Sequence, residues 1–278
     1  MAEPTHARHD ACAAADDAPI VALQGVSKSF ANGVVALDRL DLAVRPGEFL
    51  TLLGPSGCGK STALRLIAGL SAPSSGTIAW PKDFAPRAGA TRAIGFVFQE
   101  PTLMPWASVF ANVHLPLRLA GIASDKARPE VMEALARVGL ADFAEKYPRE
   151  LSGGMKMRVS IARALVTQPK LLLMDEPFAA LDEITRFRLN DDLLALWQAL
   201  SKTVVFVTHS VFESVYLSSR IVVMTPRPGR VHAELTIDAP YPRDASFRTS
   251  AHYAALCRLA SEALAGAMAA HGTDGGAT

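Results

Sequence analysis

The sequence predicts an α/β fold built around a mostly parallel sheet. Short apolar runs typical of buried strands alternate along the chain with helical patterns, and such alternation favours a parallel sheet that binds ligands at the carboxyl ends of its strands. One strand–loop–helix unit with a glycine-rich loop spans residues 48–70. Residues 100–150 carry helical patterns and no convincing strand, which indicates a helical subdomain inserted into the α/β core.

The composition limits the classes of protein to consider. The 278 residues, half of them apolar, suffice for one large domain or for a domain with a subdomain. The 28 basic and 27 acidic side chains leave a formal net charge of +1, whereas a dedicated nucleic-acid-binding protein is usually visibly basic. Cys12, Cys58 and Cys257 are too far apart for a disulfide framework or a zinc site and fit a reducing cytoplasm. No apolar run reaches the roughly 18 residues that a membrane span needs, so we expect any membrane role to depend on a partner.

The N-terminal region predicts a disordered tail followed by an antiparallel β subdomain. Residues 1–19 are rich in Ala, Asp and His and lack the apolar centre of a signal peptide. Strand-like runs follow at Ile20–Leu23 and Leu42–Val44, with turn signals at Asn32-Gly33 and Pro46-Gly47. Phe30, just before the first of these turns, fits either a core aromatic or a residue that stacks on a nucleotide base.

The remaining elements are expected in a regular order, with a loop at Pro81–Thr91. Strands are expected at Thr77–Trp80, Ile94–Phe98, Leu171–Met174, Thr203–Thr208, Ile221–Met224 and Arg230–Leu235. Helices are expected at Thr62–Leu70, Val109–Leu119, Arg128–Val138, 154–167, Glu183–Leu200, Val211–Leu217 and Ala251–Met268. The chain then divides into a tail (1–19), a main α/β domain (20–240) with its helical subdomain at about 100–165, and a C-terminal helical extension (241–278).

The loop at residues 54–62 carries the strongest motif. Gly54, Gly59, Lys60 and Ser61 occupy the fixed positions of G-x-x-x-x-G-K-S/T, between a buried strand and a helix. Glycines let several backbone N–H groups turn inward, and the positive end of the helix dipole adds to this anion site. Lys60 is expected to reach the β- and γ-phosphates of a nucleotide, and Ser61 to bind Mg²⁺.

This context argues against an ordinary glycine-rich turn and predicts a P-loop NTPase core of the RecA-like type. The nucleotide is then held by the whole loop, namely Gly54, Pro55, Ser56, Gly57, Cys58, Gly59, Lys60, Ser61 and Thr62. Because Cys58 lies inside the loop, alkylation of its thiol is expected to block nucleotide binding, and bound nucleotide is expected to protect it.

Two adjacent carboxylates form the second motif. Asp175 and Glu176 follow the apolar run Leu171–Met174, where a strand emerges into a loop. Asp175 suits a Mg²⁺ ion held opposite Ser61, and Glu176 suits the orientation or deprotonation of an attacking water, although spacing alone does not assign the two roles. A strand that simply ends in polar residues is the alternative, and the P-loop in the same chain favours the functional interpretation.

The segment Leu151-Ser-Gly-Gly-Met forms a third motif. Ser152, Gly153 and Gly154 open a helix and offer another set of backbone N–H groups to an anion. On its own, this pattern fits an N-capped helix with Ser152 as the cap.

Taken together, these motifs resemble the ATP-binding subunits of ABC transporters. The shared features occur in the family's order and spacing over roughly residues 20–235. They are the P-loop, Gln99 after an apolar strand, the signature Leu151-Ser-Gly-Gly-Met, the pair Asp175-Glu176, Ala180-Leu-Asp182, and His209 after a buried strand.

The resemblance implies a head-to-tail pair of subunits with two ATP molecules at their interface. Each ATP lies between one subunit's P-loop and the other's signature, so Ser152, Gly153 and Gly154 are implied to bind the partner's ATP and Asp182 to cross the interface. The resemblance also implies the following roles within one subunit: Phe30 stacks on adenine, Ser61, Gln99 and Asp175 bind Mg²⁺, Glu176 is the catalytic base, and Gln99 and His209 act at the γ-phosphate. Without the resemblance, a lone histidine after a strand is more often structural.

Several segments resemble one branch of the family more narrowly. Leu103-Met-Pro-Trp106, Gly154-Met-Lys and Met224-Thr-Pro-Arg-Pro-Gly-Arg are similar to the import ATPases for nitrate, sulfonates and taurine, and for thiamine-pyrimidine precursors. Pro226–Gly229 also fits a plain hairpin turn. Met155 stands where the signature commonly has Gln. This change leaves the backbone N–H donors of the signature unaffected, but it removes any contact that the Gln side chain makes.

The stretch 99–118 is expected to form the groove that receives a cytoplasmic helix of a permease. Its contact surface comprises Gln99, Pro101, Leu103, Met104, Pro105 and Trp106. Burial of Trp106 inside the helical subdomain is an equally weighted alternative. The importer resemblance further implies a peripheral location at the cytoplasmic face of the inner membrane, an indirect periplasmic or lipid-anchored solute-binding partner, and no nucleic-acid partner.

The leading hypothesis is therefore the ATPase subunit of a bacterial importer of a small solute. An ABC exporter ATPase and a soluble ABC ATPase of translation or DNA repair are the alternatives. The soluble proteins usually carry two cassettes or long coiled coils, whereas this chain has one cassette and no sustained heptads. A P-loop kinase or GTPase outside the family does not explain residues 151–155.

Overall fold

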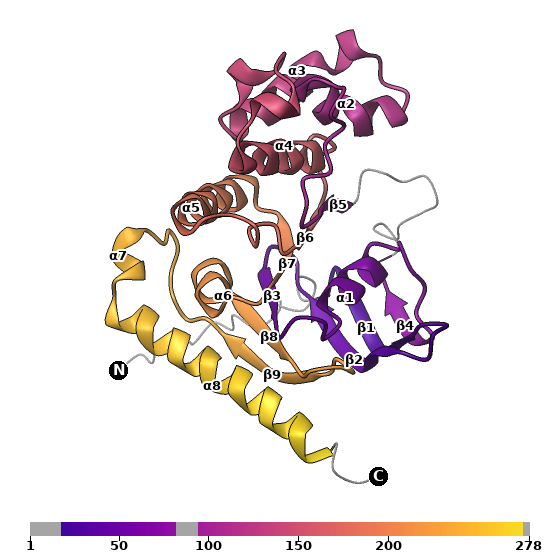
Figure 1. Cartoon of the computed structure of the whole chain (residues 1–278), viewed down its shortest axis with the longest axis vertical. Coiled ribbons are helices and arrows are strands. Elements are labelled where there is room, and N and C mark those ends of the chain that lie inside the picture. The colour runs from indigo at the N-terminus through magenta and orange to yellow at the C-terminus, as the bar shows by residue number, and fades with distance from the viewer. Residues whose placement is uncertain (1–17, 82–93, 275–278) are drawn as a thin grey trace, which may run out of the picture.

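The computed structural model describes residues 18–81 and 94–274. A two-sheet α/β core carries a helical subdomain at one end, and a long C-terminal helix crosses the other end (Figure 1). The expected tail at 1–19 and the expected loop at Pro81–Thr91 lie outside the described residues, except for positions 18, 19 and 81.

The larger sheet has six strands in the order β5-β6-β7-β3-β8-β9. The first five are parallel, and β9 is antiparallel to β8, which confirms the mostly parallel sheet. Their bounds are β3 (Phe49–Leu53), β5 (Ile94–Val97), β6 (Leu171–Asp175), β7 (Thr203–Thr208), β8 (Arg220–Met224) and β9 (Val231–Thr236). All carboxyl ends of the parallel strands therefore meet at one edge of the sheet.

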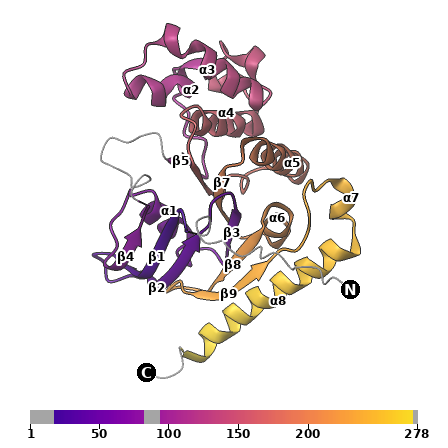
Figure 2. The same cartoon turned by 180° about the vertical axis from the view of Figure 1, so that it is seen from behind.

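The smaller sheet is antiparallel, with the order β2-β1-β4, and lies beside the larger one (Figure 2). It comprises β1 (Val21–Ser29), β2 (Val35–Val44) and β4 (Ser75–Ala79), as expected for an N-terminal antiparallel subdomain. The expected strands Ile20–Leu23 and Leu42–Val44 were too short. Gly25 and Arg39 have φ values of +56° and +46°, and the β1–β2 ladder continues past them through register shifts that break the alternating pattern.

Both faces of the larger sheet are covered. Leu50 and Leu52 of β3 pack into a core shared with α1 (Lys60–Ile67) and the smaller sheet. Phe49 and Leu53 point into the opposite core, which includes side chains of α5 (Glu183–Leu200) and α6 (Val211–Leu217). This double burial explains why the strand sequences are continuous apolar runs.

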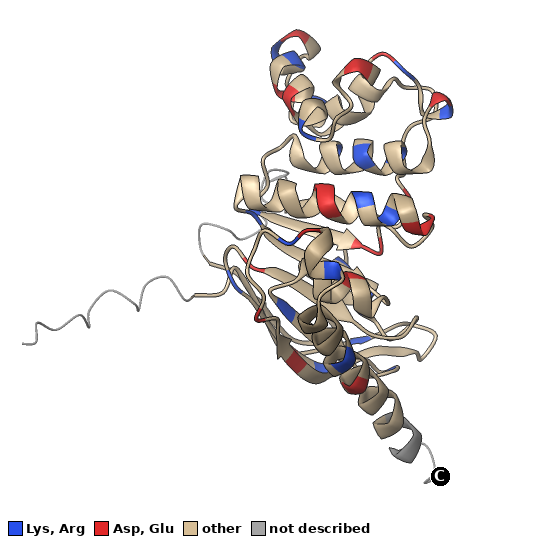
Figure 3. Ribbon diagram, turned by 90° about the vertical axis from the view of Figure 1, so that its left-hand side faces the viewer, with Lys and Arg blue, Asp and Glu red and all other residues tan. Residues whose placement is uncertain are grey.

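The helical subdomain follows β5, as expected. It contains α2 (Val109–Leu119), α3 (Ser124–Arg137), two short 3₁₀ turns (Ala141–Phe143 and Pro148–Glu150) and α4 (Gly153–Leu165). Helices α4 and α5 lie side by side (Figure 3). Helix α3 starts four residues before the expected Arg128, with Asp125 in its first turn, where an acidic side chain complements the helix dipole.

The C-terminal region differs from the expectation in two ways. Helix α8 (Ala251–Asp274) extends beyond Met268, and a short helix α7 (Ala245–Arg248) precedes it. Asp244 caps α7 by accepting hydrogen bonds from the backbone N–H groups of Ser246 and Phe247. Helix α8 packs against α6, β8 and β9. Within the described residues, no helix is long and apolar enough to cross a membrane.

Candidate active site

The loop between β3 and α1 curls around the ammonium group of Lys60. Lys60 is almost fully buried, and its Nζ donates hydrogen bonds to the carbonyl oxygens of Gly54 at 2.8 Å and Pro55 at 2.9 Å. Gly59 has a φ of +108°, and a Cβ atom there would lie 2.6 Å from the carbonyl oxygen of Ala36. Only glycine fits this position, because the backbone conformation and the neighbouring strand both exclude a side chain.

Ser61 and Asp175 meet at the start of α1 and the end of β6. Ser61 Oγ donates a hydrogen bond to Asp175 Oδ1 at 2.6 Å. Burial raises the pKa of Asp175, and the Ser61 hydrogen bond opposes this shift. One hydroxyl and one carboxylate suit Mg²⁺, which prefers oxygen ligands and takes only one or two carboxylates from a protein. The residues therefore fit the metal that the sequence predicts.

Glu176 lies between Lys60 and His209. Its backbone has a φ of +45°, and its N–H donates to the carbonyl oxygen of Val207 at 3.0 Å, which ties the residue to the neighbouring strand β7. Its Oε1 lies 3.4 Å from Lys60 Nζ, and its Oε2 lies 3.0 Å from His209 Nδ1. The two adjacent carboxylates thus have different partners, hydroxyl for Asp175 and two basic groups for Glu176.

A hollow of about 270 Å³ opens beside these groups. Its lining comes from four parts of the chain: the turn that leads into β2, the phosphate loop with the start of α1, the end of β6, and the turn after β8. The lining residues are Phe30, Asn32, Val34, Ala36, Gly57, Gly59, Lys60, Ser61, Thr62, Glu176 and Arg227. Phe30 is exposed at the rim, so the structure favours a stacking position over a core position for its ring. Sequence analysis missed Arg227, because the Pro-Arg-Pro-Gly segment was interpreted as a hairpin turn or a family marker only.

Cys58 is a buried residue of the loop. Its side chain is 1% exposed, packs in the core between the two sheets and does not line the hollow. Burial raises the pKa of the Cys58 thiol. The thiol therefore points into the core and away from the loop's open side, which makes it a poor target for alkylation, while the effect of an adduct on nucleotide binding stays a prediction.

Three predicted segments lie away from the hollow. Ser152 caps α4 by accepting a hydrogen bond from Met155 N at 3.3 Å, and Asp182 caps α5 by accepting from Thr185 N at 2.9 Å, which lowers the pKa of Asp182. Gly154 lies against α5, since a Cβ atom there would be 2.8 Å from Thr185 Cγ2. Neither these residues nor the exposed Gln99 line the hollow.

The candidate permease surface is partly formed. Trp106 is 77% exposed, which excludes its burial in the helical subdomain. Leu103 packs against the core, and Met104 is tied to Asn112 through both its backbone N–H and its carbonyl. A groove of about 340 Å³ lies nearby, between β5, α2 and α4, with Phe98, Leu115, Leu119 and Arg163 in its lining.

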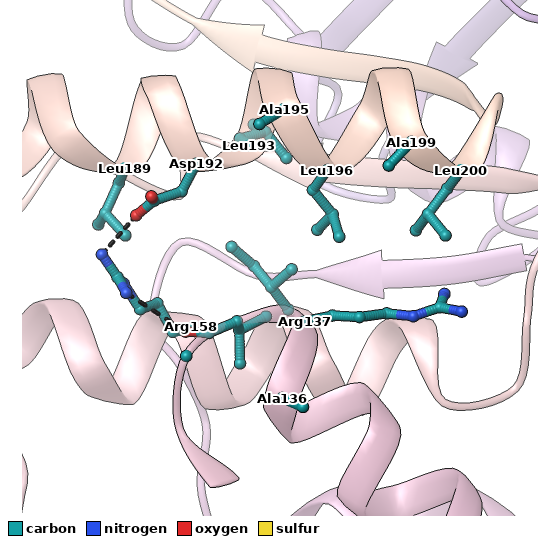
Figure 4. Close-up of a pocket in the computed structure, with 13 residues that line it drawn as sticks. Ala136, Arg137, Arg158, Leu189, Asp192, Leu193, Ala195, Leu196, Ala199 and Leu200 are labelled. Carbon is teal, nitrogen blue, oxygen red and sulfur yellow. Dashed lines mark hydrogen bonds and ion pairs between the residues drawn. The ribbon is translucent and has the colours of Figure 1, made fainter.

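Another hollow, of about 580 Å³, lies between the C-terminal part of α5, the end of α3 and α4 (Figure 4). Its walls are mostly apolar, and one of them is formed by α5 through Leu189, Leu193, Ala195, Leu196, Ala199 and Leu200. Arg158 of α4 pairs with Asp192 of α5 across it, and Arg137 pairs with Glu133. No predicted site residue lines this hollow, so it contributes no group to the chemistry described above.

Comparisons with known proteins agree with this geometry. The family model described as ABC transporter matches residues 37–179. The nitrate import ATP-binding protein of Synechocystis is 47% identical over 75% of this chain and 78% of its own length, and the taurine import ATP-binding protein of Rhizobium johnstonii is 46% identical over 75% and 79%. A solved dimeric ATP-binding cassette in a post-hydrolysis state, bound to ADP and Pi, has a TM-score of 0.68 and 33% identity, with 79% of this chain and all of the other covered.

Proposed function

The chain belongs to the ABC transporter family and resembles its nitrate, sulfonate and taurine import ATP-binding proteins, and from that premise we propose that it energises uptake of a small solute of this kind through a separate permease. A thiamine-pyrimidine precursor is a second class of solute for the same architecture. As a member of this family, the chain binds and hydrolyses ATP.

Two pairs of side chains, Ser61 with Asp175 and Lys60 with Glu176, converge beside one hollow, and this convergence supports the use of ATP in the proposal. Ser61 and Asp175 are the proposed protein ligands of Mg²⁺, and the metal neutralises charge on the phosphates when bound. Lys60, now paired with Glu176, is proposed to turn to the β- and γ-phosphates of ATP. Glu176 is then left to accept a proton from the attacking water, and His209, in contact with Glu176, is proposed to contact the γ-phosphate.

The rest of the loop is proposed to hold the phosphate chain, and Phe30 the base. Gly57, Gly59 and Thr62 line the hollow and have backbone N–H groups at or near the start of α1, where the helix dipole favours an anion. The exposed ring of Phe30 at the rim offers a flat face to adenine.

We further propose that the site is completed by a second copy of the chain. Ser152 and Gly153 are exposed at the start of α4, and Asp182 lies at the exposed start of α5, yet none of them lines the chain's own hollow. A head-to-tail dimer gives these residues a nucleotide to bind. The solved cassette that matches this chain is itself a dimer.

The permease is proposed to bind beside Gln99. Leu119 is exposed and lines the groove between β5, α2 and α4, Trp106 is also exposed, and Gln99 lies two positions after the end of β5. This arrangement supports a peripheral position on the cytoplasmic face of the inner membrane, with a solute-binding protein as an indirect partner. Gln99, a proposed ligand of Mg²⁺ with a part in catalysis, then links the nucleotide to the membrane partner through a two-state element.

The domain division remains a proposal of the same kind. We propose an ABC ATPase domain at 20–240, with its helical subdomain at about 100–165, and an extension at 241–278. The extension packs against the ATPase core through buried Tyr253, Cys257 and Ala260, so its removal is expected to expose apolar surface.

Affinity purification of the tagged chain from its own membranes tests the importer proposal. The expected result is co-purification of a multi-span permease, with ATPase activity that rises when solute and its binding protein are added to the reconstituted complex. Stable co-purification with ribosomes or DNA, without any permease, would overturn the proposal.

A further inference from the structure

The turn between β8 and β9 is fixed against the phosphate loop. Gly229 N donates to the carbonyl oxygen of Ala36 at 2.9 Å, and Asp38 N donates to the carbonyl oxygen of Gly229 at 3.1 Å. Arg230 pairs with Asp38 at 2.5 Å. A Cβ atom on Gly229 would lie 2.1 Å from the carbonyl oxygen of Cys58, so the turn touches the loop backbone directly. The turn is therefore held in place by β2 on one side and the loop on the other.

Arg227 stands at the tip of this turn and lines the nucleotide hollow. Its Nε donates a hydrogen bond to the carbonyl oxygen of Gly57 at 3.1 Å, 170 positions away in sequence. This bond fixes the guanidinium at the edge of the loop. Among the described residues, no acceptor receives the Nη hydrogens of Arg227, and the side chain is exposed. Four donors are thus held beside the hollow without a protein partner.

The charges in the hollow favour an anion next to Arg227. The charged side chains in its described lining are Lys60, Glu176 and Arg227, and Lys60 is already opposed by Glu176 at 3.4 Å. Arg227 is therefore the cation that no carboxylate balances. A guanidinium presents a planar fork of donors that matches phosphate oxygens.

We infer that Arg227 binds the β- or γ-phosphate of ATP and serves as a second cation of the nucleotide site, beside Lys60. The inference rests on the proposal that the loop at 54–62 holds ATP. Arg227 approaches from the side of the loop opposite to Glu176 and His209, because β8 and β7 flank β3 in the sheet. The Arg227–Gly57 bond also couples the position of the phosphate loop to the β8–β9 turn.

Three variants of the full-length chain test the inference by isothermal titration calorimetry with ATP, ADP and AMP. Arg227→Gln is expected to weaken ATP binding about tenfold, in the range of a charge-assisted hydrogen bond to phosphate, and to weaken AMP binding much less. Arg227→Lys keeps the charge without the fork and is expected to restore part of the affinity. Arg230→Gln removes the same charge from the same turn outside the hollow and is expected to change ATP affinity less than about twofold.

Each other outcome decides against the inference. Unchanged ATP affinity in Arg227→Gln means that the guanidinium does not bind the nucleotide. Equal weakening of ATP and AMP places the contact on the base, the ribose or the α-phosphate instead. Equal weakening in Arg230→Gln, at an unchanged melting temperature, means that the general charge of the turn and not a contact by Arg227 sets the affinity. Thermal unfolding of each variant without nucleotide checks that the exposed substitutions leave the fold intact.

A Lys60→Ala variant separates this inference from the proposal beneath it. If Lys60→Ala binds ATP as tightly as the parent chain, the loop at 54–62 is not the nucleotide site. If Lys60→Ala loses ATP and Arg227→Gln does not, the nucleotide site stands and only the role of Arg227 falls.

Discussion

Replacing Glu176 by glutamine removes one negative charge from the centre of the site and keeps the side chain's shape. Glu176 Oε1 lies 3.4 Å from Lys60 Nζ, and Oε2 lies 3.0 Å from His209 Nδ1. A positioned general base contributes about 10²–10⁴-fold to a rate. If Glu176 is the base, turnover should therefore fall at least about 100-fold in the variant.

ATP affinity is expected to change in the opposite direction. The side chains of Lys60 and Glu176 are 3% and 15% exposed, so their pair is largely buried. Removing one partner of a buried ion pair costs about 3–5 kcal/mol, but Lys60 keeps two carbonyl acceptors, so we expect a loss of about 2 kcal/mol in the free energy of unfolding without nucleotide. ATP supplies the missing negative charge. Its affinity should then rise by up to about tenfold, which corresponds to about 1.4 kcal/mol.

Three measurements on purified protein check these magnitudes: phosphate release, thermal unfolding with and without ATP and Mg²⁺, and size-exclusion chromatography. Glu176→Gln should show a lower melting temperature without ATP, a larger increase on adding ATP, and an ATP-dependent dimer. Glu145→Gln, at a position that is 79% exposed, makes the same chemical change as a control and should behave like the parent chain. Normal hydrolysis by Glu176→Gln would refute its role as the base, and weaker ATP binding would refute the electrostatic pairing with Lys60.

Three further changes test other parts of the molecule. Burial raises the pKa of the Cys58 thiol, so the thiol is less ionised in the folded chain than in the unfolded chain. Its labelling by iodoacetamide at pH 8, measured by mass spectrometry, should be at least about tenfold slower in native protein than in urea-unfolded protein. Equal labelling rates would contradict its place in the core. Gly154→Ala puts a Cβ atom 2.8 Å from Thr185 Cγ2 and should lower the free energy of unfolding, measured in urea, by about 1–3 kcal/mol. The control Gly153→Ala should lower it less. Equal losses in the two variants would argue against close packing of α4 on α5. Trp106→Ala should leave the stability and ATPase activity of the isolated chain unchanged but reduce transport by a reconstituted complex, and full transport would place the permease contact elsewhere.

Several elements with a clear pattern were predicted to the residue. Helices Val109–Leu119, Glu183–Leu200 and Val211–Leu217 and strand Thr203–Thr208 have the expected bounds. Their periodicity follows directly from burial, on one face for the helices and on both faces for the strand. Strands β1 and β2 were underestimated, because their bulges are set by pairing with each other and leave no periodic trace in either sequence.

Which side chains lie together at the site was predictable where one short segment carries them. Ser61, Asp175 and Glu176 were named from motifs, but their separate partners were not, since spacing along the chain does not say which carboxylate meets which basic group. The direction of the Cys58 side chain was not predictable for a similar reason. Membership of a loop does not tell which way a side chain points, and the core between the two sheets takes this one.

The order of the strands in the larger sheet explains which predicted site residues lie together and which do not. The loop after β3 lies between the ends of its two neighbours, β7 and β8, and β6 is the next strand beyond β7. The parallel direction thus brings Glu176 and His209 to one side of the loop and Arg227 to the other. Ser152 and Asp182 begin helices instead of following strands, so the sheet gives them no route to the same hollow. The exposed helix starts, set apart from the hollow at the strand ends, support the proposal that a second copy of the chain supplies the other half of the catalytic chamber.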